Sequence, residues 1–80
     1  MENKDKITML VSCIENVEGQ DEIKRQIERL ENLYRIKEKT PDEPEVQSWS
    51  LSEYNAKIIE HKTMLLDYEK VFKDMITVLG

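Results

Sequence analysis

The sequence predicts an all-α fold: an antiparallel helical hairpin with a shorter N-terminal helix, packed as a coiled-coil-like three-helix bundle. Apolar residues recur at three- and four-residue spacing through most of the 80 residues, as they do on one face of an α-helix. Both prolines, Pro41 and Pro44, fall in one short segment between two such stretches. We therefore expect a single helical domain over residues 1–80. Its core is small, and dimerisation can complete it.

The N-terminal segment, residues 3–17, is predicted to form the shorter helix. It carries aliphatic residues at helical spacing, namely Ile7, Leu10, Ile14 and Val17. Residues 21–39 carry a second stripe with the same spacing, formed by Ile23, Ile27, Leu30 and Tyr34. At about 100° per residue, the second stripe points roughly 160° away from the first if one unbroken helix contains both.

Two structures can account for two apolar stripes that point in different directions. A break at Gly19, with the glycine as a C-cap and Asp21 in the next N-terminal turn, folds the first helix back onto the hairpin. An unbroken helix from Asn3 to Lys39 instead presents apolar faces on opposite sides, so its first third would bury against another molecule. We favour the break, because glycine costs about 1 kcal/mol inside a helix.

Residues 40–49 are predicted to form the turn between the two long helices. Pro41 and Pro44 end the preceding helix, because neither has an N–H to donate to the helical ladder. The next helix begins at Ser50, which forms an S-x-x-E capping box with Glu53. Trp49 and Tyr54 occupy the two positions of a hydrophobic staple, so three local signals agree on this helix start.

The last helix, residues 50–79, shows a heptad pattern over four heptads. Its a and d positions are Leu51, Tyr54, Ile58, His61, Leu65, Tyr68, Phe72, Met75 and Leu79. Ile59 and Leu66 lie outside this face and are one heptad apart. We interpret this pair as the first candidate surface for binding a protein partner. The second candidate is the edge of the first helix formed by Met9, Val11 and Cys13.

Charge and cysteine content limit the partners and the compartment. The net charge is −5 and the pI is near 4.9, which argues against direct binding to nucleic acid or to an anionic membrane. We expect neither a signal peptide nor a membrane span at the N-terminus. Cys13 is the only cysteine, and its apolar neighbours favour a role as a small buried apolar residue. A single cysteine cannot form a disulfide within the chain, so we expect a cytoplasmic protein.

Residues that carry catalytic chemistry do not form a recognisable set. His61 is the only histidine and occupies a d position, where we expect a neutral imidazole hydrogen-bonded across the seam. No glycine-rich phosphate loop exists, because the only glycines are Gly19 and Gly80. We therefore expect no enzyme activity, no catalytic, cofactor-binding or metal-binding residues, and no small-molecule substrate.

The function that this pattern favours is protein binding by a small acidic adaptor, assembly chaperone or inhibitor. Its partner would be another protein, a second copy of the chain, or both, because the helix over residues 50–79 carries more apolar surface than one shorter antiparallel helix can cover. An acidic inhibitor that mimics nucleic acid is the alternative, but lysines and arginines are interspersed with the acids almost everywhere except residues 42–45.

Two short segments give a further alternative. The turn sequence KTPDEP, residues 39–44, and the sequence KVFKDM, residues 70–75, resemble the Pro-x-x-Pro turn and the C-terminal Lys-Val-x-Lys-Asp segment of type III secretion needle subunits. The resemblance covers about a dozen residues and implies a helical hairpin subunit. The two segments are about one helical turn further apart than in the needle pattern, and the helices are more charged, so no residue role is transferred.

Overall fold

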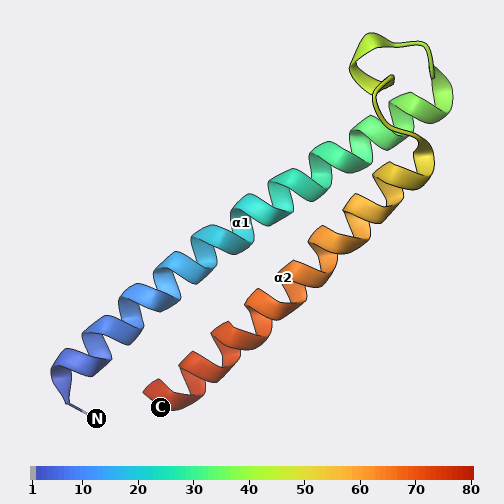
Figure 1. The fold of residues 1–80 in the computed structure, drawn as a ribbon. Helices are drawn as coiled ribbons and strands as arrows, with labels where there is room; N and C mark the ends of the chain where they lie inside the picture. Colours follow the sequence, from blue (N-terminus) through green and yellow to red (C-terminus); the bar gives the residue numbers. More distant parts are fainter. Residues whose placement is uncertain (1) are drawn as a thin grey trace.

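The computed structural model of this protein describes residues 2–80 as two long helices joined by a turn. Helix α1 spans Asn3–Lys39, the short 3-10 helix η1 spans Pro44–Val46, and α2 spans Leu51–Leu79. The long helices lie side by side and antiparallel, with both termini at the same end (Figure 1). The molecule is a rod with dimensions of 58 × 16 × 14 Å.

The predicted helical hairpin is confirmed, but the predicted break at Gly19 is wrong. Helix α1 runs unbroken from Asn3 to Lys39, so residues 3–17 do not form a separate helix that folds back. The residues of α1 that face α2 keep three- and four-residue spacing straight through this region. They are all buried or half-buried: Met9, Cys13, Asn16, Gln20, Ile23, Ile27, Leu30 and Tyr34.

Two of these seam residues are polar, and they hydrogen-bond to one another and to α2. The amide nitrogen of Asn16, a buried residue, donates to the main-chain carbonyl of Tyr68 at 3.0 Å. Gln20 donates from its Nε2 to the Asn16 Oδ1 at 2.7 Å. A buried amide paired in this way favours one alignment of two helices over others, so Asn16 helps to set the hairpin register.

The heptad assignment of α2 is confirmed by burial. Most of its a and d residues are buried or half-buried against α1, namely Tyr54, Ile58, His61, Leu65, Phe72, Met75 and Leu79. Leu51 and Tyr68 lie at the edges of the seam and are partly exposed. The Nδ1 of His61 lies 2.8 Å from the Lys57 carbonyl in its own helix, so the predicted hydrogen bond across the seam is wrong.

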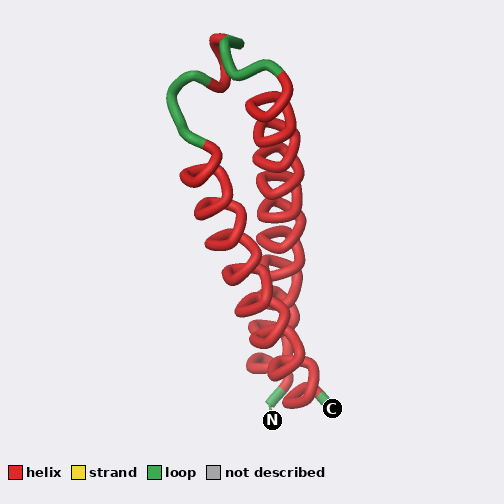
Figure 2. The backbone as a smooth tube through the Cα atoms, turned by 90° about the vertical axis from the view of Figure 1, so that its right-hand side faces the viewer, coloured by secondary structure: helices red, strands yellow, loops and turns green. Residues whose placement is uncertain are grey.

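The turn closes one end of the hairpin and contributes a core residue that the sequence analysis missed. Figure 2 shows the turn looping beyond the ends of both helices. Val46, in η1, is fully buried, and η1 packs against α1. The Nε2 of Gln47 donates to the Asp42 carbonyl at 2.7 Å, which links the two arms of the turn. Val46 therefore extends the apolar seam into the turn.

Helix α2 begins where predicted, with one of the two hydrogen bonds of the predicted capping box and the predicted ring contact. Ser50 is the N-cap, and its hydroxyl oxygen accepts a hydrogen bond from the Glu53 main-chain N–H at 3.2 Å. The rings of Trp49 and Tyr54 pack edge to face, with centroids 5.2 Å apart and an interplanar angle of 61°. Trp49 thus covers Tyr54, which is buried, and the staple fixes the direction in which the chain enters α2.

Replacing the N-cap residue by Ser50→Ala should lower the free energy of unfolding by about 1 kcal/mol, because one N–H of the first turn loses its acceptor. Urea denaturation followed by circular dichroism measures the change. Ser52→Ala is the matched control, since Ser52 lies in the same turn without capping it, and it should leave the unfolding midpoint nearly unchanged. Equal effects of both substitutions would contradict the role of Ser50.

Candidate protein-binding surface

Ile59 and Leu66 lie on the outer side of α2, as their heptad positions predict. Their side chains are 56% and 64% exposed. Leu66 also lines a groove between α2 and α1 with a volume of about 590 Å³. Ile27 and Leu65 contribute apolar surface to this groove, but Ile59 is not among its lining residues. The predicted pair is therefore exposed on one helix, and only Leu66 joins a concave site.

Charged side chains of both signs surround the apolar part of this groove. Lys24 and Glu28 come from α1, and Lys62 comes from α2. A small apolar centre with a charged border is the usual composition of a surface that binds another protein. The arrangement provides a place for an aliphatic side chain of a partner, with polar contacts around it.

The second predicted surface, at Met9, Val11 and Cys13, is not a single surface in the structure. Val11 is exposed, whereas Met9 is half-buried and Cys13 is buried in the seam against α2. Because α1 turns by about 100° per residue, Val11 points away from the seam that Met9 and Cys13 share. The interpretation of Cys13 as a small buried hydrophobe is confirmed, so its thiol has little surface to offer a partner.

A larger exposed apolar surface lies at the N-terminal end of α1, and the sequence analysis assigned it to the core. Ile7, Leu10, Ile14 and Val17, here called the N-terminal stripe, are between 41% and 62% exposed. The expected three-helix bundle would have buried them, but α1 does not fold back. The sequence feature that indicates their exposure is the angle between the two apolar stripes of α1. In an unbroken helix the two stripes lie on different faces, and α2 can cover only one of them.

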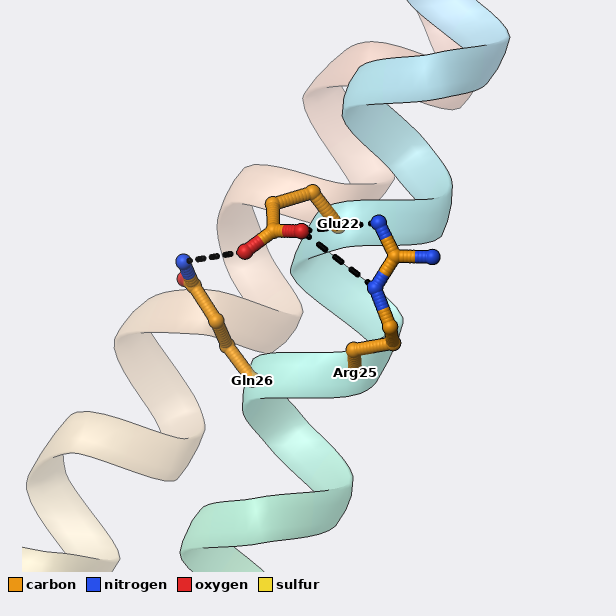
Figure 3. Close-up of polar contacts among 3 residues, drawn as sticks. All are labelled: Glu22, Arg25 and Gln26. Atoms are coloured by element: carbon orange, nitrogen blue, oxygen red, sulfur yellow. Dashed lines mark hydrogen bonds and ion pairs between the residues drawn. The ribbon is translucent and has the colours of Figure 1, made fainter.

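One acidic side chain on α1, Glu22, is paired with a basic and an amide group beside it. Figure 3 shows the Glu22 carboxylate between Arg25 and Gln26. Arg25 donates from its guanidinium to Glu22 at 2.8 Å, and Gln26 donates to the other carboxylate oxygen at 3.3 Å. The hydrogen bonds and charge of Arg25, with a smaller effect of Gln26, lower the pKa of Glu22, and the same pair raises the pKa of Arg25.

A second ion pair joins Lys57 and Glu60 at 3.5 Å on α2. Both ion pairs lie on exposed helix surfaces, where they are solvated and screened by salt. Each pair joins residues three positions apart within one helix. We therefore assign them to the solvated faces of the hairpin.

Two further properties bear on the site. Among residues 2–80, no cluster of three or more histidine, cysteine, aspartate or glutamate side chains is arranged to hold a metal ion. Neither helix in that part of the chain combines the length and apolar character needed to cross a membrane. Comparison of the chain with protein-family models, curated proteins and solved structures finds no match.

Proposed function

We propose that this chain is a small non-enzymatic protein-binding module, acting as an adaptor, an assembly chaperone or an inhibitor. The observation that carries the proposal is the large amount of exposed apolar surface compared with the small buried core. Within residues 2–80, the exposed large apolar side chains outnumber the buried apolar residues of the core. Two helices cover only one face of each other, and contiguous exposed apolar surface is typical of proteins that bind a partner.

The contact that we propose for the partner is the outer side of α2, centred on Leu66 and Ile59. Leu66 lies at the groove formed with α1, and Ile59 lies two helical turns away on the same side of α2. This arrangement suits an amphipathic helix that places aliphatic side chains against both residues, because helices dock through anchors at three-, four- and seven-residue spacing. The border of Lys24, Glu28 and Lys62 would supply polar contacts to such a helix.

The test replaces both anchors in one variant, Ile59→Lys with Leu66→Lys. Helicity should be nearly unchanged, because both side chains are exposed and surface substitutions usually cost less than about 0.5 kcal/mol. Partner binding should weaken strongly, since two aliphatic anchors contribute roughly 3–6 kcal/mol of apolar transfer. Circular dichroism measures the helicity, and quantitative pull-down from a lysate of the source organism measures the binding.

The matched control is the double variant Met64→Lys with Val71→Lys. These residues are also apolar and exposed, are seven positions apart on the same helix, and introduce the same added charge on a different side of α2. The proposal requires the control to capture the same proteins as the parent chain while the Ile59 and Leu66 variant loses them. Equal capture by all three chains would exclude the outer side of α2 as the binding surface.

A further inference from the structure

The N-terminal stripe has a property that the groove on α2 lacks: its pattern is the same when read in either direction. Ile7, Leu10, Ile14 and Val17 are separated by three, four and three residues. The stripe is open to solvent and is turned by roughly 110° about α1 from the seam residues Met9, Cys13 and Asn16. From this geometry we propose that the N-terminal stripe joins two copies of the chain, with their α1 helices antiparallel.

Antiparallel pairing brings every member of the stripe against another member. Ile7 meets Val17 of the second copy, and Leu10 meets Ile14 of the second copy. A two-fold axis near residue 12 then repeats both contacts, which is the self-complementary arrangement of a symmetric dimer. The alternation of three and four residues is also the spacing with which two helices interlock their side chains.

The residues beside the stripe fit the same arrangement. Lys4 and Glu18 are exposed and flank the stripe on one side, at positions that lie opposite each other when the helices are antiparallel. Val11, which is 48% exposed, lies on that same side and meets Val11 of the second copy across the axis. A parallel pair would instead place Glu18 beside Cys13 and leave Lys4 without an opposite charge, so charge favours the antiparallel pair.

The size of this surface fits a weak, specific dimer. The stripe and Val11 together expose roughly 400 Å² of side-chain surface per copy, or about 800 Å² per dimer. Stable complexes bury roughly 1,200–2,000 Å² in total, and polar contacts beside the stripe would add to the apolar area here. Asn3 and Asp21 are polar and limit the stripe at both ends. The groove beside Leu66 begins at Lys24, outside the stripe, so this proposal is independent of the proposed partner site.

Sedimentation equilibrium of the full chain tests the dimer. The parent chain should dimerise with a dissociation constant in the micromolar range. Ile14→Lys should weaken the dimer by at least about 100-fold, because the two-fold symmetry introduces the buried charge twice. Thr8→Lys adds the same charge at an exposed position of α1 that points away from the stripe, and it should change the constant by less than about threefold.

Charge exchange tests the orientation of the helices. Lys4→Glu alone should weaken the dimer several-fold, because it places two acids opposite each other. Adding Glu18→Lys to the same chain should restore the parent constant to within about twofold, since the pair is then exchanged. Circular dichroism of each variant checks that the hairpin itself is unchanged.

Cross-linking tests the position of the axis in a Cys13→Ala background, which removes the native thiol. In the proposed dimer, the two copies of residue 11 are about 3 Å apart along the helix axis, whereas the two copies of residue 18 are about 18 Å apart. A short bismaleimide linker should therefore join chains that carry Val11→Cys and leave chains that carry Glu18→Cys unjoined. Both positions are exposed, so thiol access is matched.

Three results would overturn the proposal. The first is a parent chain that remains monomeric up to millimolar concentration, which would leave the stripe to another protein. The second is a dimer that Ile14→Lys does not weaken. The third is equally efficient linking at positions 11 and 18, which indicates a parallel or unspecific contact.

Discussion

Substituting aspartate for Ile58 should abolish cooperative unfolding of the hairpin. Ile58 is 8% exposed and borders the seam together with Tyr34 of α1. An ionised carboxylate at this position loses its hydration and costs several kcal/mol. A domain of this size has a total stability of about 5–15 kcal/mol, and this hairpin has few fully buried residues with which to offset the loss.

Thermal and urea melts followed by far-ultraviolet circular dichroism measure this effect. Ile59→Asp is the matched control, because it is the neighbouring isoleucine with the same chemical change at a side chain that is 56% exposed. The control should melt within a few degrees of the parent, since exposed substitutions usually change stability by less than about 0.5 kcal/mol. Retention of a cooperative melt by the Ile58→Asp variant would contradict the seam assignment of α2.

The parts of the fold that could be predicted from sequence depend on short-range signals. The start of α2 was predicted because Ser50, Glu53 and the Trp49–Tyr54 pair all act within one helical turn. The seam of α2 was predicted because nearly all of its a and d residues are apolar, so the periodicity identifies the buried face directly. The turn was predicted because proline acts on its own backbone and on the residue before it.

The first third of α1 could not be assigned in this way, because its buried face is partly polar. Asn16 and Gln20 occupy seam positions and satisfy each other by hydrogen bonding. Counting apolar residues therefore selects the N-terminal stripe as the core face, although the structure exposes it. The partner of Asn16 is the carbonyl of Tyr68, and a contact over such a sequence distance leaves no local pattern.

The candidate binding surface, like the fold, could be predicted from the sequence only in part. Ile59 and Leu66 were identified as exposed because their phase on α2 is fixed by a clear heptad pattern. The groove beside Leu66 was not predictable, because it depends on how α1 lies against α2. Val46 was missed for a similar reason, since a single valine in an acidic turn has no periodicity and is buried only by the path of the turn.

Gly19 is the remaining feature that the sequence alone misassigned, and the structure explains it through Tyr68. The glycine lies in the middle of α1, where it costs about 1 kcal/mol relative to alanine. The ring of Tyr68 lies directly over it: a Cβ built on Gly19 would come 2.5 Å from the Tyr68 Cε2 and 3.2 Å from its Cδ2. The absence of a side chain at residue 19 therefore allows α2 to approach closely at Tyr68.

Gly19→Ala should accordingly have opposite effects in two backgrounds. In the parent chain it should lower the free energy of unfolding by about 1–2 kcal/mol, because displacing the ring costs more than the helix gains. In a Tyr68→Ala background the ring is absent, and the same substitution should raise the free energy of unfolding by about 1 kcal/mol. Urea denaturation of the four chains gives the coupling between the two residues. Stabilisation of equal size in both backgrounds would show that the ring does not require the glycine.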